Sequence, residues 1–291
     1  MKPLQKTEPW LPKMVVLPSF GISLLFIYGL MAWNGYLSVS ASRLLPNYEF
    51  VGLQHYAALM ESDRFQVAMS NMAVFGVLFI GGAMALGVLL AILLDQKVRG
   101  EGVLRTIYLY PMAISFIVTG TAWKWMLNPG LGLEHLMHSW GFSSFSFDWL
   151  VQQDMAIYCV VIAGVWQSAG FVMALFLAAL RGIDDSIIKA AQVDGASLPT
   201  IYWRIILPSL GPVFFSTLLV VSHLAIKSFD LVMALTAGGP GYATDLPATF
   251  MYATAFTRGQ IGVGAASATV MLATVAAIVV PYLYSELRSK R

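Results

Sequence analysis

Charged residues are scarce in this chain of 291 residues: only 11% are Asp, Glu, Lys or Arg, whereas 58% are hydrophobic. A soluble globular domain usually carries about 25% charged residues. The shortage excludes an ordinary soluble domain and indicates a polytopic membrane protein. The formal net charge is only +2, so charge gives no reason to expect a nucleic-acid partner.

Cysteine is almost absent as well, since Cys159 is the only one. A single cysteine cannot form a disulfide within the chain or a cysteine-based metal cage, and Cys159 lies in an apolar run, as a small buried residue does. His135 and His138 follow Glu134, but a third protein ligand is lacking nearby, so we expect no metal. No nucleophile–base arrangement stands out either, and we expect no catalytic residue.

The dipeptide Gly-Lys is missing from the sequence. This absence excludes a Walker A loop, whose lysine binds nucleotide phosphates. If ATP drives the protein, another polypeptide therefore hydrolyses it. We also expect no bound cofactor.

Apolar runs are abundant, and a membrane-spanning helix needs about 20 apolar residues. The predicted fold class is all-α and integral to the membrane, with six transmembrane helices at about residues 14–33, 72–94, 106–127, 155–180, 208–229 and 261–285. A signal peptide is the alternative for the first run, but its apolar core would be shorter, at about 7–15 residues. Trp123 and Trp125 flank one span end and suit an interfacial aromatic belt.

Residues 230–258 are apolar too, but Gly238, Gly239, Pro240, Gly241 and Pro247 interrupt them. We do not count this stretch as a span and expect a tight turn at residues 238–241.

Basic residues predict the orientation. With both termini in the cytoplasm, the inner side holds twelve of the seventeen basic residues, as the positive-inside rule requires. These are Lys2, Lys6, Lys13, Lys97, Arg99, Arg105, Arg181, Lys189, Arg204, Arg288, Lys290 and Arg291. We therefore expect a cytoplasmic N-terminus at residues 1–13, a transmembrane domain at residues 14–291 and a cytoplasmic segment at residues 181–207.

The cytoplasmic segment is predicted to form a short helix, a sharp turn and a second helix. Gly195 suits a left-handed C-terminal cap, and Pro199 suits the start of the second helix. Three N-cap candidates precede the first helix: Asp184, Asp185 and Ser186.

Small apolar residues in the first helix, Ala190, Ala191 and Val193, make a face that fits a groove on a partner. An ordinary helix at the membrane surface is the alternative, and the pattern alone favours it.

The same segment carries a resemblance to a known family. Ala190-Ala191-x-x-Asp194-Gly195-Ala196, then Ile205-x-Leu207-Pro208 and Pro212, is similar to the EAA motif of bacterial ABC importer permeases. Lys189 departs from the family, which usually has Glu there. Residues 50–56, Asn71, 128–132, 229–231 and 236–241 resemble the carbohydrate-uptake branch, and residues 107–111 and 281–287 look most like glucose/mannose-type permeases.

The resemblance implies a MetI-like permease subunit of an ATP-driven, binding-protein-dependent sugar importer in the bacterial inner membrane. It implies three partners: a second permease of different sequence, a cytoplasmic ATP-binding dimer and an extracytoplasmic sugar-binding protein. The permease would form half of the translocation path and couple to the ATPase through residues 186–208. The coupling residues would be Lys189, Ala190, Ala191, Asp194, Gly195, Ala196, Leu207 and Pro208.

Polar and aromatic residues in or beside the spans are candidates for the substrate path, because such groups are costly in a membrane unless they function or pair. They are Asn71, Trp166, Gln167, His223, Lys227 and Asp230. An aromatic face with amide groups suits a sugar ring, although aromatic residues in spans more often serve packing. Lys227 and Asp230 are three residues apart, so pairing on one helical face is their alternative role.

A secondary transporter or channel acting alone is the main alternative function, and a membrane enzyme is the second. Secondary transporters often have broken helices near the middle of the membrane. Here we expect the clearest helix breaks in the loops.

Overall fold

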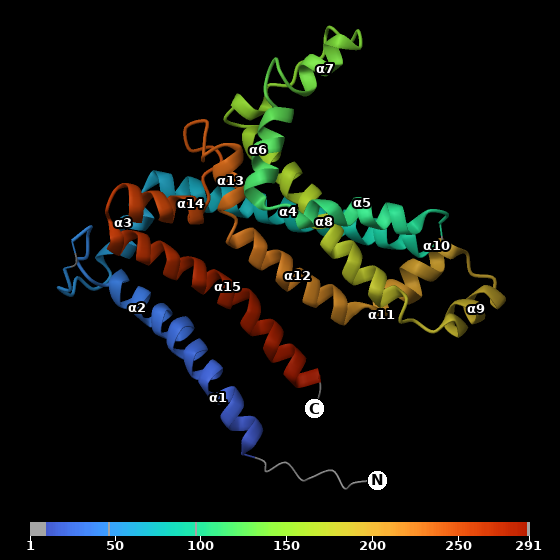
Figure 1. Ribbon diagram of the computed structural model, residues 1–291, viewed down its shortest axis with the longest axis horizontal. Helices are drawn as coiled ribbons and strands as arrows, with labels where there is room; N and C mark the ends of the chain where they lie inside the picture. Colours follow the sequence, from blue (N-terminus) through green and yellow to red (C-terminus); the bar gives the residue numbers. More distant parts are fainter. Residues whose placement is uncertain (1–9, 46, 97, 290–291) are drawn as a thin grey trace. The chain divides into compact units, whose positions relative to one another are not determined.

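A computed structural model describes residues 10–45, 47–96 and 98–289, and this part of the chain consists of helices and the segments that connect them (Figure 1). The all-α fold class is thus confirmed. The chain divides into two compact units, Met1–Leu59 with Met251–Val270 and Met60–Phe250 with Met271–Arg291. Five of the twelve basic residues counted above lie outside the described residues: Lys2, Lys6, Lys97, Lys290 and Arg291.

Among the described residues, four helices are long and apolar enough to cross a membrane: Lys13–Ser38, Asp63–Asp95, Ala156–Leu180 and Ile261–Tyr282. Two further pairs of helices pass the same test together, but each pair is bent at a short break. They are Glu101–Ala113 with Phe116–Met126, bent by 101°, and Leu198–Ser209 with Gly211–Ile226, bent by 71°. Counting each bent pair as one span gives six, the predicted number.

The first unit contains the first candidate span and the beginning of the last. The first span consists of α1 (Leu11–Ser23), a π-helical turn and α2 (Gly29–Ser38), and the last is α15 (Ile261–Ser289). Asn34 links them, because its Nδ2 donates to the Ala265 carbonyl at 3.1 Å and to Thr269 Oγ1 at 3.1 Å. Such bonds between spans satisfy polar groups, because lipid tails offer them no hydrogen-bond partners.

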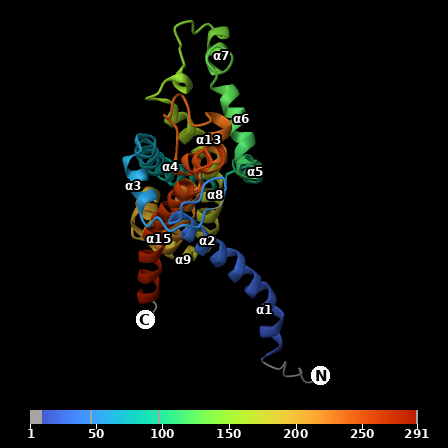
Figure 2. The ribbon, with the colours of Figure 1, turned by 90° about the vertical axis from the view of Figure 1, so that its left-hand side faces the viewer.

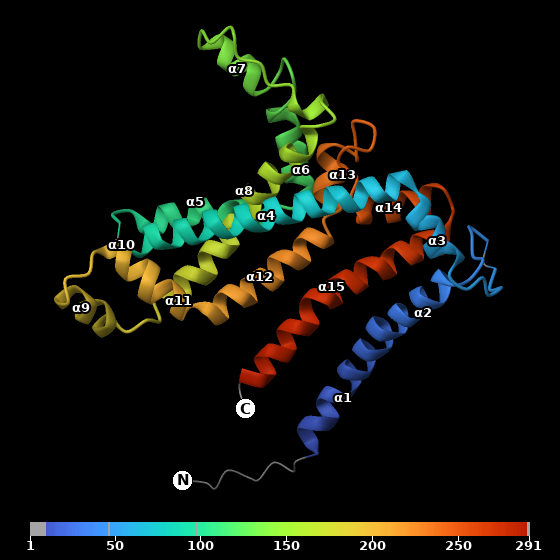
Figure 3. The same ribbon diagram turned by 180° about the vertical axis from the view of Figure 1, so that it is seen from behind.

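The second unit is centred on α4 (Asp63–Asp95) and α8 (Ala156–Leu180), which lie side by side (Figures 1 and 3). Glycine permits this close approach, since a Cβ added at Gly87 would lie 2.5 Å from Val172 Cβ. Membrane helices commonly pack through small residues in this way, because close van der Waals contact drives their association.

Four shorter helices among the described residues pack around this pair: α5 (Glu101–Ala113), α6 (Phe116–Met126), α12 (Gly211–Ile226) and α13 (Asp230–Leu235). Later in the chain, α14 (Pro247–Tyr252) begins in the second unit and ends in the first. Figure 2 shows α6 and α13 next to one another, with α7 (Leu133–Ser139) beyond the end of α6. Residues 230–258 therefore hold short helices and turns, and the prediction that they form no span is confirmed. The predicted turn at residues 238–241 is replaced by two successive turns, in which Gly239 N donates to Thr236 O at 3.0 Å and Ala243 N donates to Pro240 O at 3.0 Å.

The third span differs from the prediction, because Thr106–Leu127 is not one continuous helix. Pro111 cannot donate a backbone hydrogen bond, Ile114 is extended, and the Ser115 hydroxyl caps α6 by accepting from Val118 N at 3.3 Å. These features end one helix and start another in a new direction. The expectation that the clearest breaks lie in loops was therefore wrong.

Candidate functional site

The segment after α8 forms the predicted helix–turn–helix, with α9 (Asp185–Val193) followed by α10 (Leu198–Ile201) at one end of the second unit (Figure 3). Asp184 is the N-cap among the three candidates: it is extended, and its Oδ1 accepts from Ser186 N at 2.8 Å. This hydrogen bond to the carboxylate lowers the pKa of Asp184. The charge also suits the positive end of the helix.

Gly195 closes α9 as predicted, with a left-handed φ of +80°. Gly195 N donates to Gln192 O at 3.0 Å, and Ala196 N donates to Ala191 O at 3.0 Å. These two bonds are the Schellman pattern, which satisfies the last carbonyls of a helix and reverses the chain. Nothing lies within 4 Å of a Cβ added at Gly195, so the backbone angle alone calls for glycine there.

The outer face of α9 is apolar and exposed. Ile187 is 46% exposed and Val193 is 87% exposed, and Ala190 lies between them at helical spacing. Ala191 is only 7% exposed and belongs to the core of the second unit, so it supports α9 from within. The exposed face that a partner could contact is therefore Ile187, Ala190 and Val193.

Tyr202 ties this segment to the end of α4. Its hydroxyl donates to Asp95 Oδ2 at 2.6 Å and accepts from Gln96 Nε2 at 2.7 Å. Sequence reasoning missed this link, because nothing local connects two residues so far apart.

Lys189 lines a cavity of about 580 Å³ between α9 and the end of α4. Asp95, Glu101 and Asp185 line it too. Glu101 is engaged in an ion pair with Arg181. Lys189 is exposed and has no ion pair within the described part of the chain. The Lys189 ammonium group therefore shares its cavity with carboxylates.

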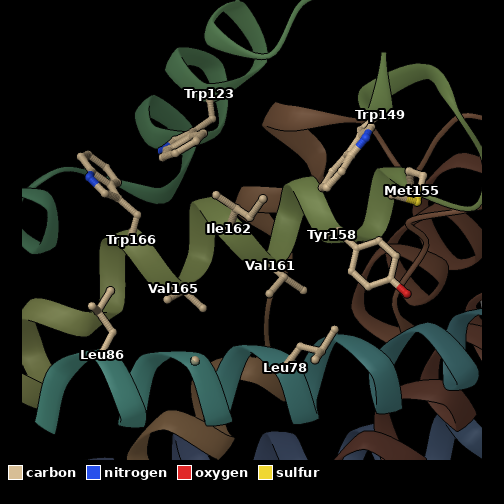
Figure 4. A pocket seen from close by; sticks show the side chains of 11 residues that line it. Leu78, Leu86, Trp123, Trp149, Met155, Tyr158, Val161, Ile162, Val165 and Trp166 are labelled. Atoms are coloured by element: carbon tan, nitrogen blue, oxygen red, sulfur yellow. The ribbon is translucent and has the colours of Figure 1, made fainter. Parts of the chain in front are cut away.

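A second cavity, of about 680 Å³, is lined by α4, α6, α8 and the turn at Trp149–Val151 (Figure 4). Trp123 and Trp166 lie edge to face in it, with ring centroids 5.8 Å apart. Figure 4 shows Trp149 beside the beginning of α8, near Met155 and Tyr158. The sequence analysis named Trp166 as a candidate for the substrate path and Trp123 as part of an interfacial belt, and both line this cavity.

Gln167, another predicted path residue, is buried next to the broken third span. Its Nε2 donates to the Ile114 carbonyl at 2.7 Å, in the break between α5 and α6. Its Oε1 is buried and has no hydrogen-bond partner within the part of the chain that the structure describes. A buried acceptor left free is unusual and calls for an explanation.

Asn71 holds a turn of the chain in place. Its Nδ2 donates to the backbone oxygens of Tyr242, at 3.3 Å, and Asp245, at 3.0 Å. Arg64 forms an ion pair with Asp245, and its guanidinium lies 4.4 Å from the Tyr242 ring centroid. The Thr249 hydroxyl donates to Asp245 Oδ1 at 2.7 Å. No local pattern pointed to Arg64 or Asp245, since pairing between residues so far apart in the chain depends on the fold.

His223, Lys227 and Asp230 are exposed. Lys227 caps the end of α12, whereas Asp230 begins α13, so the two lie on different helices and not on one helical face. Among the described residues they form no ion pair. The suggested pairing of Lys227 with Asp230 was therefore wrong, and their place in the substrate path stays a prediction.

Comparisons with known proteins bear on this arrangement. The profile of the family described as "Binding-protein-dependent transport system inner membrane component" matches residues 83–289. A probable ABC transporter permease of Pyrococcus horikoshii is 38% identical over 96% of this chain and 97% of its own length. A xylose/arabinose import permease of Haloferax volcanii is 37% identical over 89% of this chain and 82% of its own length.

A solved structure shares the fold. A chain of a bacterial ABC transporter for the import of the acidic polysaccharide alginate superposes with a TM-score of 0.84 at 22% identity, covering 97% of this chain and 96% of the other.

Proposed function

The chain belongs to the family of inner membrane components of binding-protein-dependent transport systems, and from this we propose that it is the permease subunit of an ATP-driven sugar importer. The xylose/arabinose import permease, with its 37% identity, supports a sugar as the substrate. The motifs of residues 128–132 and 236–241, which resemble the carbohydrate-uptake branch, support it as well.

Both termini and α9 lie in the cytoplasm in this proposal. The support is the distribution of basic residues, of which twelve of seventeen fall on that side. The subunit then works with a second permease of different sequence, a cytoplasmic ATP-binding dimer and an extracytoplasmic sugar-binding protein. Together the two permeases enclose the path.

Coupling to the ATPase falls to the helix–turn–helix, and the exposed apolar face of α9 is the observation that carries this proposal. Ile187, Ala190 and Val193 would enter a cleft of the ATP-binding subunit, in the way that an amphipathic helix enters a groove. Leu207 and Pro208, which open α11 (Leu207–Ser209), join the segment to α12. A movement of α9 that nucleotide binding causes would then be transmitted to α12.

The substrate path in this proposal passes the broken third span. Gln167 Oε1 would accept a hydrogen bond from a sugar hydroxyl, which accounts for a buried acceptor without a partner among the described residues. Trp166 offers an aromatic face beside it. Discontinuous helices expose backbone groups and form substrate sites in other transporters, and the Ile114 carbonyl lies at such a break.

The test is uptake by proteoliposomes that contain the purified complex, with xylose, arabinose, maltose and trehalose as labelled substrates. We expect uptake of at least one sugar only when ATP, the ATP-binding subunit and the binding protein are all present. Uptake by this chain alone, driven by an ion gradient, would contradict the proposal and indicate a secondary transporter.

A further inference from the structure

A cavity of about 780 Å³ lies in the first unit, where the segment after α2 meets the segment before α15. Arg43, Arg258 and Asn47 line it, and no acidic residue is among its described lining residues. Both arginines are exposed, and neither has an ion pair within the described part of the chain. The cavity thus offers two guanidinium groups and an amide to an anion.

The segment that carries Arg43 is held by hydrogen bonds. Gly262 N donates to Ser42 O at 2.9 Å, and Ala41 N donates to Glu49 O at 2.8 Å. The Ser42 hydroxyl donates to Asn47 O at 2.8 Å. These bonds fix the backbone directly before Arg43 and at Asn47 and Glu49, which reduces the backbone ordering needed when a ligand binds.

The cavity lies at the ends of two candidate spans. The first span ends at Ser38 and the last begins at Ile261, so Arg43 and Arg258 each lie only a few residues along the chain from a span end. Aromatic residues lie close to the same span end.

Trp33 and Tyr36 of α2 pack around Tyr48 of the following segment, with ring centroids 5.9 Å and 6.1 Å from the Tyr48 ring. Such a cluster is typical of the headgroup region of a membrane. The segment that carries Arg43 therefore lies at headgroup depth.

Large apolar side chains next to the arginines point to the same environment. Leu44, Leu45 and Phe256 line the cavity and are 75%, 81% and 69% exposed. At the boundary between headgroups and acyl chains this exposure is favourable, because the side chains meet lipid tails while the guanidinium groups remain among the phosphates.

From this geometry we propose that the cavity binds the phosphate of an anionic phospholipid. Arg43 and Arg258 hold the phosphate oxygens, for which the planar guanidinium is well matched. Leu44, Leu45 and Phe256 contact the first part of the acyl chains. The lipid thereby joins the two span ends at the surface of the first unit. This site is independent of the sugar and of the ATPase.

Native mass spectrometry of the full-length chain in detergent tests the proposal, with phosphatidylglycerol as the probe and diacylglycerol as the matched lipid without phosphate. We expect Arg43→Gln and Arg258→Gln each to weaken phosphatidylglycerol binding by roughly fivefold, the effect of one basic residue at an anionic surface. The double variant weakens it further. Arg99→Gln, an exposed arginine outside the cavity, leaves binding unchanged.

Three results would overturn the proposal: wild-type affinity in the double variant, equal losses in Arg99→Gln, or diacylglycerol bound as tightly as phosphatidylglycerol. A double variant that keeps lipid affinity but loses the sugar-binding protein from the assembled complex would assign the arginines to a protein contact instead. Unchanged thermal unfolding of the variants confirms that exposed positions were altered without loss of fold.

Discussion

The Tyr202 hydroxyl lies 2.6 Å from Asp95 Oδ2, 107 positions away in the sequence. This hydrogen bond joins the last residue of α4 to the segment that follows α10. Since α4 packs along α8, a displacement of α9 and α10 has a direct route into the centre of the second unit. In the proposed importer this is the route from ATPase to spans.

Replacing Tyr202 by Phe tests that route. The ring packing remains, but the bonds to Asp95 and Gln96 are lost, and a hydrogen bond to a charged group contributes about 1.5–3 kcal/mol. We expect the complex to retain its ATPase while sugar uptake per ATP hydrolysed falls at least about fivefold. Tyr110→Phe, at an exposed position, is the matched control. Equal uptake by wild type and Tyr202→Phe would remove this link from the mechanism.

The two ion pairs described in the second unit differ in burial, so removing them should lower the free energy of unfolding by different amounts. Asp245→Asn leaves the largely buried Arg64 without its counter-ion and should lower the free energy of unfolding by about 3 kcal/mol. Arg181→Gln breaks the more exposed pair with Glu101 and should lower it by less than about 1 kcal/mol. Thermal unfolding in detergent measures both losses. Comparable losses would show that the buried Arg64–Asp245 pair stabilises the fold no more than the exposed pair does.

If the cavity lined by Trp123, Trp149 and Trp166 belongs to the substrate path, its aromatic rings contact the sugar. Trp166→Ala should reduce sugar uptake roughly fivefold at low sugar concentration, since an aromatic contact contributes on the order of 1 kcal/mol beyond area burial. ATP hydrolysis without sugar should not change. Trp125→Ala removes an exposed indole outside the cavity and serves as the control. If the two variants transport alike, the cavity is a packing feature and not part of the path.

The hydrogen bond that Asp184 accepts predicts that the stability of α9 depends on pH. Its pKa is lowered in the folded chain, because its carboxylate accepts a hydrogen bond from the Ser186 amide. The carboxylate therefore stabilises α9 above the ordinary pKa of an aspartate, and this contribution is lost as the pH falls through the lowered pKa.

ATPase retention by the wild type should thus weaken at acidic pH. Asp184→Ala should retain less ATPase at neutral pH, and its retention should change less when the pH is lowered. A steeper acid response in the variant than in the wild type would contradict the role of Asp184 as the cap.

Local signals in the sequence were sufficient for the helix–turn–helix. An N-cap at Asp184 and a left-handed cap at Gly195 depend on neighbouring backbone groups, so residue type and order predict them. The break in the third span had local signals too, in Pro111 and Ser115, but hydrophobicity over Thr106–Leu127 concealed it.

Contacts between distant residues could not be predicted in this way. Arg64 meets Asp245, and Tyr202 meets Asp95, because α4 passes beside later parts of the chain. Ala191 is a related case: its type suits an exposed docking face, but the packing of α9 turns it inward.

Gly195 tests the central claim, that the α9 helix–turn–helix couples this permease to an ATPase. Its φ of +80° is costly for other residues, by about 1–2 kcal/mol for most and least for Asn. Because a side chain at this position meets no neighbouring atom, Gly195→Val and Gly195→Asn differ in backbone strain and not in clashes within the chain.

The measurement is the amount of ATP-binding subunit that co-purifies from detergent with wild type, Gly195→Asn and Gly195→Val, compared with sugar uptake in cells. The account predicts that Gly195→Val loses both the ATPase and uptake, while Gly195→Asn keeps most of each. Full ATPase retention and uptake in Gly195→Val, or an active wild type that brings down no ATPase, would contradict it.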